Sequence, residues 1–144
     1  MGEISKTDLE IGRLLSSLED TYPLLQEVAF HKAVEADRIL ALIVGKGDVA
    51  RLLRHGGKIV RTIGEKTGKT VRVLEFGVDD RKFLEDLFAP FSIVTINTIW
   101  LPDGSKETRV IVRRQGRRYP LKAEALKQLA HKVRGITLRV EFAD

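Results

Sequence analysis

A basic stretch of helix-forming sequence is broken by a pair of glycines. The apolar run 39–44 leads into Gly45-Lys46-Gly47-Asp48, and the helix-forming residues that follow are interrupted at Gly56-Gly57 before residues 70–76 become rich in β-branched side chains. Glycine inside a helix costs about 1 kcal/mol relative to alanine, so the pair predicts a tight turn between two short helices. Such a turn brings backbone N–H groups and a helix N-terminus close to a ligand, and it suits an anion.

The charges fall into blocks along the chain. Residues 45–75 carry 8 basic and 3 acidic side chains, and residues 106–139 carry 11 and 2. The segments 1–44 and 76–105 are acidic, so the overall net charge of +5 hides two strongly basic regions. Separate basic blocks indicate two electropositive faces that can follow a polyanion such as nucleic acid.

The composition also excludes several classes of site. The chain has 144 residues, no cysteine and three scattered histidines. We therefore expect no disulfide, no cysteine-ligated metal, no histidine metal site and no cofactor. No apolar run reaches transmembrane length and the N-terminus does not resemble a secretory signal, so the sequence predicts a cytoplasmic protein without a membrane partner. No acidic cluster or second histidine accompanies His55, so we expect no enzymatic activity.

Hydrophobic periodicity and turn residues predict alternating helices and strands. Residues 24–44 allow either a hairpin or a helix, and the β-rich run that stops at Gly45 favours the hairpin. The expected helices are 7–18 with a cap at Thr7-Asp8 and an end at Tyr22-Pro23, 48–53 capped by Asp48, 58–66 ended by Gly68, 81–88 capped by Asp79-Asp80, and 122–133 ended by Gly135. The expected strands are 27–34, 39–44 with a turn at 35–37 before it, 71–76, 93–101, 108–113 and 136–142.

An internal repeat runs through this order. Residues 40–44, 59–63 and 71–76 correspond to residues 110–113, 125–129 and 138–142, and Gly68 corresponds to Gly135. The repeat predicts an α/β (α+β) protein of two tandem modules, each a small three-stranded sheet packed against helices. We place the first module at residues 1–78 and the second at residues 79–144.

The run Gly45-Lys46-Gly47 allows a competing interpretation as a dinucleotide-binding turn. It follows a strand, opens a helix, and the next strand ends in Glu75. That fold needs one continuous helix between the two strands, and here the helix would have to pass through Gly56-Gly57 and Gly64. We therefore keep a dinucleotide-dependent enzyme only as a weaker alternative.

The segment Arg54-His55-Gly56-Gly57 resembles the GxxG loop of KH domains, which clamps the backbone of about four single-stranded nucleotides. Nearly the whole chain resembles the short archaeal-type NusA transcription factors. This resemblance rests on the N-terminal helix and on the segments 44–48, 54–61, 68–76 and 87–90. It implies two tandem KH domains of the type II order. Arg54 stands where the first loop glycine is expected, and the second module has Pro120-Leu121-Lys122-Ala123 with neither glycine.

The resemblance implies an RNA-binding transcription factor that acts in termination or antitermination through single-stranded RNA, with RNA polymerase as a further partner. Its RNA-contacting residues would be Arg54, His55, Gly56, Gly57, Lys58, Arg61 and Arg72 in the first module, and Arg117, Arg118, Lys122 and Lys127 in the second. Ile59 and Ile63 would shape an apolar groove for bases against residues 72–74. Tyr119 and Trp100 are candidates for stacking on bases, although core or edge packing is the simpler interpretation of Trp100. The broken loops favour an alternative, a KH-fold protein–protein adaptor for polymerase or ribosomal complexes with weak RNA binding.

Overall fold

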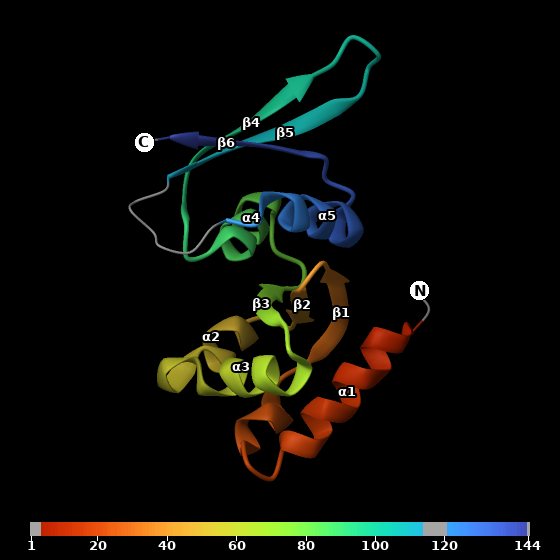
Figure 1. The fold of residues 1–144 in the computed structure, drawn as a ribbon, viewed down its shortest axis with the longest axis vertical. Helices are drawn as coiled ribbons and strands as arrows, with labels where there is room; N and C mark the ends of the chain where they lie inside the picture. The colour runs from red at the N-terminus through yellow and green to blue at the C-terminus, as the bar shows by residue number, and fades with distance from the viewer. Residues whose placement is uncertain (1–3, 114–120, 144) are drawn as a thin grey trace. The chain divides into compact units, whose positions relative to one another are not determined.

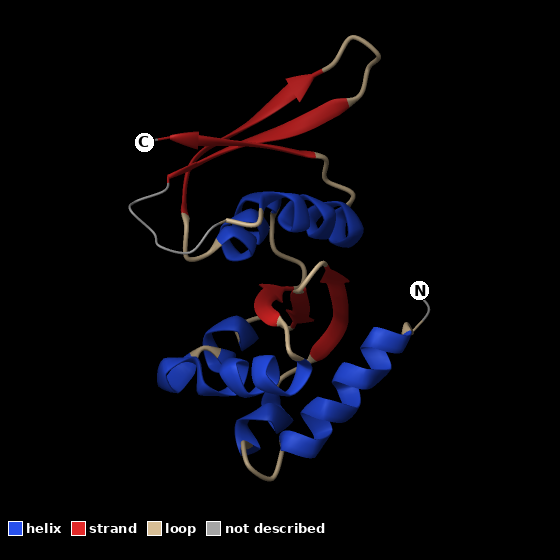
Figure 2. Ribbon diagram, in the orientation of Figure 1, coloured by secondary structure: helices blue, strands red, loops and turns tan. Residues whose placement is uncertain are grey.

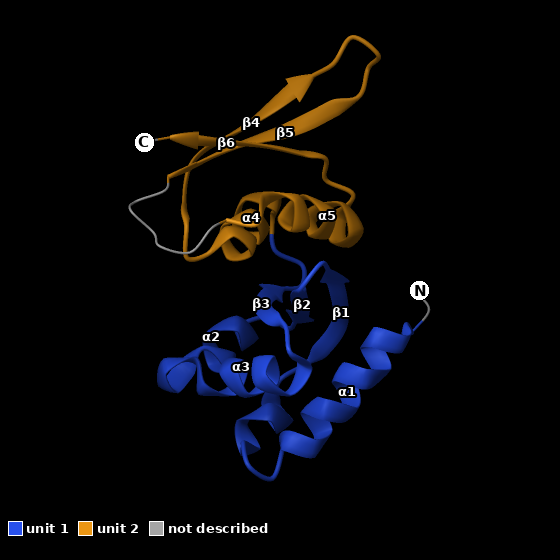
Figure 3. Ribbon diagram, in the orientation of Figure 1, with its two compact units in different colours: residues 1–78 blue, residues 79–144 orange. Residues whose placement is uncertain are grey.

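The computed structural model describes residues 4–113 and 121–143, and the chain divides into two compact units, residues 1–78 and 79–144. Each unit contains its own three-stranded sheet with helices on one face of it (Figures 2 and 3). An α/β architecture with two small sheets is therefore confirmed.

The first unit is built around a mixed sheet in the order β1-β2-β3. Strand β1 runs antiparallel to β2, and β2 runs parallel to β3, with Leu40 opposite Val71 and Leu42 opposite Val73. The connection from β2 to β3 contains two helices, as a parallel connection requires. The elements in chain order are α1 (Lys6–Leu18), the 3₁₀ helix η1 (Pro23–Glu27), β1 (Phe30–Ala36), β2 (Ile39–Val44), α2 (Asp48–Leu52), α3 (Arg54–Thr67) and β3 (Thr70–Glu75) (Figure 1).

The second unit repeats this topology. Strand β4 is antiparallel to β5 and β5 is parallel to β6, so β5 and α5 hold the places of β2 and α3. Its elements are α4 (Asp80–Phe88), β4 (Ser92–Trp100), β5 (Lys106–Arg113), α5 (Ala123–Arg134) and β6 (Leu138–Ala143). Helices α3 and α5 both end at a left-handed glycine, Gly68 and Gly135. The two units therefore share one sheet topology, as the sequence repeat predicts. The α-β-β-α-α-β order of the first unit is that of a type II KH domain.

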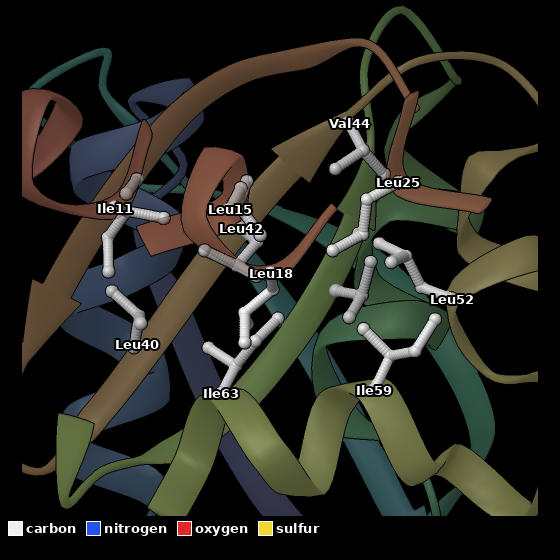
Figure 4. Packing of buried hydrophobic residues seen from close by; sticks show 12 residues of the cluster. Ile11, Leu15, Leu18, Leu25, Leu40, Leu42, Val44, Leu52, Ile59 and Ile63 are labelled. Carbon is white, nitrogen blue, oxygen red and sulfur yellow. The ribbon is translucent and has the colours of Figure 1, made fainter. Parts of the chain in front are cut away.

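The core of the first unit lies between the sheet and its helices. Apolar side chains from α1, η1, α2 and α3 meet the inward face of the sheet, and Figure 4 shows Ile59 and Ile63 directed from α3 into this cluster. The buried members are Ile11, Leu15, Leu18, Leu25, Ala33, Leu40, Leu42, Val44, Leu52, Ile59, Ile63 and Val73. Because every one of them lies between residues 11 and 73, this cluster is built from the first unit alone.

Two helix caps differ from the sequence expectation. Helix α1 starts one residue earlier than expected, because Ser5 is its N-cap. Ser5 Oγ accepts from the N–H of Asp8, and the carboxylate of Asp8 accepts from the N–H of Ser5. Asp8 therefore closes a capping box rather than acting as the cap itself. At α2 the N-cap is Gly47, and the expected cap Asp48 is the first helical residue. No side-chain hydrogen bond caps this helix.

The segment between α1 and β2 also differs in detail. Helix α1 ends at Leu18, before Tyr22-Pro23, and Pro23 instead opens η1. The hairpin interpretation is confirmed, but β1 continues through Ala36, and the turn is made by Asp37 and Arg38 rather than by residues 35–37. Asp37 takes the left-handed conformation with φ 54°, which aspartate tolerates better than most residues. The expected cap at Asp79 is confirmed, since its carboxylate accepts from the N–H of Lys82.

Candidate nucleic-acid interface

The range of α3 contains a kink near its start, where three consecutive residues in the left-handed region form the loop between α2 and the regular part of α3. His55, Gly56 and Gly57 have φ of 56°, 70° and 74°. This conformation is accessible to glycine but costs other L-residues about 1–2 kcal/mol. The expected glycine break is confirmed, and its local backbone strain is concentrated at His55.

The two glycines lie in open space. A Cβ atom built at Gly56 or Gly57 would meet nothing within 4 Å, so glycine is required here by the backbone angles and not by crowding. The backbone of the loop is therefore accessible to a ligand. No acidic residue lies in the first turn of α3, so no carboxylate offsets the positive end of the helix dipole there.

The basic side chains around the loop are of two kinds. Arg54, His55 and Lys58 are exposed, and neither Arg54 nor Lys58 forms an ion pair with any described residue. Arg61 is exposed as well, but its Nη1 donates to the carbonyl oxygen of Gly56 at 2.8 Å. Arg61 thus braces the loop from one turn further along α3, while Arg54 and Lys58 are available to an anion.

The second glycine-containing turn, Gly45–Asp48, is held together by hydrogen bonds to a buried carboxylate. Asp48 is 2% exposed, and its Oδ2 accepts from the N–H groups of Ala29 and Gly45 at 2.8 and 3.1 Å, while Oδ1 pairs with Arg51. Burial raises the pKa of the Asp48 carboxyl, but these hydrogen bonds and the Arg51 charge outweigh burial, and the net pKa is lowered. A Cβ at Gly45 would lie 2.9 Å from Asp48 Oδ2, so glycine is needed here for close approach.

This geometry removes the dinucleotide interpretation. The helical segment between β2 and β3 is broken by the left-handed loop, whereas that fold needs a continuous helix. Glu75, which would bind a ribose, instead accepts from the N–H of Gly47 at 3.1 Å.

Three other expected residues lie away from the loop or in the core. Arg72 alternates with Val71 and Val73, which face α3, so its side chain leaves β3 on the opposite face of the sheet. Ile63 is fully buried and cannot line an open groove, and that expectation is wrong. Ile59 is 5% exposed and borders a cavity whose other wall is residues 21–24 rather than β3.

Comparisons with known proteins identify two curated archaeal relatives. One from Methanocaldococcus jannaschii, named probable transcription termination protein NusA, is 34% identical over 77 residues, which is 54% of this chain and 40% of that protein. This chain is a homologue of archaeal NusA over that segment. A protein of the same name from Methanococcus vannielii is 26% identical over 77 residues, 54% of this chain and 43% of that protein.

The NusA match therefore spans about two fifths of the relatives' lengths, and no protein-family model matches the chain. The crystal structure of APE1850 resembles the chain with a TM-score of 0.59 at 19% identity, and the match covers 91% of this chain and 96% of that one. At this identity the likeness shows the fold alone. It extends over both units, which supports the tandem arrangement that the NusA resemblance implies.

The structure describes only two of the residues expected to contact RNA in the second unit. Lys122 is exposed at the N-cap of α5, and Lys127 is half-buried with its Nζ 3.4 Å from a carboxylate oxygen of Glu124. Arg117, Arg118 and Tyr119 lie outside the described residues. Residues 114–120 of the connection between β5 and α5 also lie outside the described part of the chain.

Trp100 is more exposed than the sequence predicts. It is 70% exposed at the end of β4, and the Nζ of Lys106, its partner across the hairpin, lies 5.9 Å from the ring centroid. Core packing is therefore wrong for Trp100, which lies on the edge strand β4. The turn signal at Pro102–Ser105 indicated a hairpin tip, where a strand extends past the helices that would cover it (Figure 1).

Within residues 4–113 and 121–143 no group of three His, Cys, Asp or Glu side chains is placed to hold a metal ion. In the same ranges no helix has both the length and the apolarity to cross a membrane.

Proposed function

We propose that this chain binds single-stranded RNA through the loop between α2 and α3 and acts, like the archaeal proteins it resembles, in the control of transcription termination or antitermination. The observation that carries the proposal is the loop itself. Three left-handed residues expose backbone at the start of α3, beside Arg54 and Lys58, which have no ion-pair partner among the described residues. The relatives are named as transcription termination proteins, and neither name is that of an enzyme.

The physical chemistry of the loop suits a phosphate backbone better than a protein surface. Glycine allows the chain of the ligand to approach closely, and the helix dipole and the cations Arg54 and Lys58 favour negative charge. Arg61 donates to the Gly56 carbonyl at 2.8 Å, so this loop acceptor already has a hydrogen-bond partner within the protein. Binding by phosphate contacts releases counterions, so we expect affinity to fall steeply as salt rises.

The test is a fluorescence-anisotropy titration with short single-stranded RNA, matched single-stranded DNA and duplex RNA at two salt concentrations. We expect binding to single-stranded RNA that is lost when Gly57→Asp and Lys58→Glu are combined, because both changes add negative charge at the loop. The matched control is Gly68→Asp with Lys66→Glu. It replaces a left-handed glycine equally free of crowding at the other end of the same helix and changes the charge by the same amount.

Equal loss of affinity in both double variants would show that only net charge matters and would contradict the loop as the site. A second readout is the ratio of terminated to read-through transcripts made by purified archaeal RNA polymerase. We expect the wild-type chain to change this ratio and the loop variant not to do so.

The second candidate function is a protein–protein adaptor. It is favoured by the second unit, where the sequence Leu121-Lys122-Ala123 leads into α5 without a glycine. Absence of RNA binding by the wild-type chain at low salt, together with stable binding to purified RNA polymerase, would select this function over the first.

A further inference from the structure

A cavity of about 520 Å³ adjoins the loop, and none of its lining residues belongs to β3. One wall is residues 21–24, at the start of η1 between α1 and β1, and the other is Arg54, His55, Lys58 and Ile59. Its volume falls in the range of small-molecule sites, about 300–1,000 Å³. We propose that this cavity receives one unstacked nucleobase of the single-stranded RNA whose backbone lies on the loop, an inference that rests on the function proposed above.

The lining combines the two chemistries that a nucleotide presents. Tyr22, Pro23, Leu24 and Ile59 offer an aromatic ring and aliphatic surface for the faces of a base, and Arg54, His55 and Lys58 line the side toward the loop, where a phosphate would lie. None of the lining residues is acidic. Single-stranded nucleic acid is held by this combination of stacking surfaces and a cationic track.

The Tyr22 ring is held in place before any ligand arrives. The hydroxyl of Thr62 donates to the carbonyl of Lys58 at 3.0 Å, and the hydroxyl oxygens of Tyr22 and Thr62 lie 2.9 Å apart. A threonine hydroxyl has one proton, so the Tyr22 hydroxyl donates in the second bond. A ring that is already ordered and half-buried loses little conformational freedom on stacking, which favours binding.

The cavity also links base and phosphate recognition through shared residues. His55, Lys58 and Arg54 belong to the loop or its flanks, and the Lys58 carbonyl anchors the bond that orders Tyr22. An RNA backbone lying on the loop can therefore place an adjacent base in the cavity. The base does not need to reach the buried face of α3, where Ile63 is inaccessible.

The first test fills the cavity from its rim. Thr21→Trp puts an indole at an exposed lining position, and Gln26→Trp puts the same side chain on the exposed surface of η1 outside the lining. In anisotropy titrations with single-stranded RNA we expect Thr21→Trp to weaken binding about tenfold, the size of losing one stacked base, and Gln26→Trp to change it less than about twofold. Urea unfolding of both variants verifies that each is folded.

The second test has a main readout in the wild-type chain, which does not depend on how a variant folds, and Thr21→Trp serves as its comparison. A single abasic position is scanned through the RNA, and we expect one position to lower affinity about tenfold in the wild type and to have no effect in Thr21→Trp. RNA carrying 5-bromouridine at that position should crosslink to residues 21–24.

The outcomes separate this inference from the proposed function. If RNA binding is lost in the Gly57→Asp and Lys58→Glu variant but unchanged in Thr21→Trp, with crosslinks only outside residues 21–24, the cavity does not hold a base and the loop function stands. If the wild type binds no single-stranded RNA, both the function and the cavity assignment are overturned.

Discussion

At the scale of single residues, Asp48 shows how one buried carboxylate stabilises a turn. Its oxygens accept from the N–H groups of Ala29 and Gly45 and pair with Arg51, so they join the segment before β1 to the start of α2. Asparagine at this position has one acceptor oxygen instead of two and no charge. We expect Asp48→Asn to lower the free energy of unfolding by about 2 kcal/mol at pH 7, measured by urea denaturation.

The same residue predicts a pH dependence. The folded-state pKa of Asp48 is below its ordinary value, so its contribution is fully present above about pH 4 and is lost as the pH falls through the folded-state pKa. The stability difference between wild type and Asp48→Asn should therefore narrow below about pH 4. Asp20→Asn, at an exposed position, is the control. A difference that stays constant to the lowest pH would contradict this account of Asp48.

At the scale of an element, the β4–β5 hairpin carries an aromatic side chain that stabilises little. Trp100 is 70% exposed, so we expect Trp100→Ala to change the free energy of unfolding by less than about 0.5 kcal/mol. Leu129, fully buried on α5, is the comparison, and Leu129→Ala should cost about 2–5 kcal/mol. Trp100 is also the single tryptophan of the chain, so its emission should show a solvent-exposed indole that acrylamide quenches readily. A blue-shifted, protected emission would contradict the exposed hairpin.

At the scale of the whole molecule, we propose that the two compact units are two domains and that residues 1–78 fold alone. The buried cluster of the first unit draws only on residues 11 to 73, so its core needs nothing from the second unit. We expect a fragment of residues 1–78 to unfold cooperatively in urea. A fragment of residues 1–66 should not, because it lacks β3, the partner of β2 and the source of Val73. A disordered 1–78 fragment would contradict the proposal.

Much of the fold could be predicted because it depends on local rules. The loop at Gly56-Gly57, the left-handed ends of α3 and α5 and the cap at Asp79 each follow from what one residue type can do with its own backbone or side chain. The caps of α1 and α2 were predicted less well. Serine, threonine and aspartate compete for the same role at neighbouring positions, and Asp48 is drawn to partners 3 and 19 residues away.

The sequence indicated which residues surround the candidate loop but not how they are arranged. The sequence indicated a basic glycine loop, and the structure places Arg54 and Lys58 beside it with no ion-pair partner among the described residues. It also shows Arg61 bracing the loop, Arg72 on the other sheet face and Ile63 in the core. The cavity against Tyr22 joins segments about 30 residues apart, and no local pattern identifies such a pair.

The sequence by itself determined the order of elements, the repeat of two modules, the left-handed loop and the sign of the charge around it. These follow from backbone sterics, hydrophobic period and composition, which act over a few residues at a time. Only the tertiary structure decided which of the described loop cations lack an ion pair, which glycine serves a close approach, that Trp100 is exposed and that Tyr22 faces the loop. These depend on which distant side chains compete for the same space and the same hydrogen bonds, and packing settles that competition when the sheet closes over its helices.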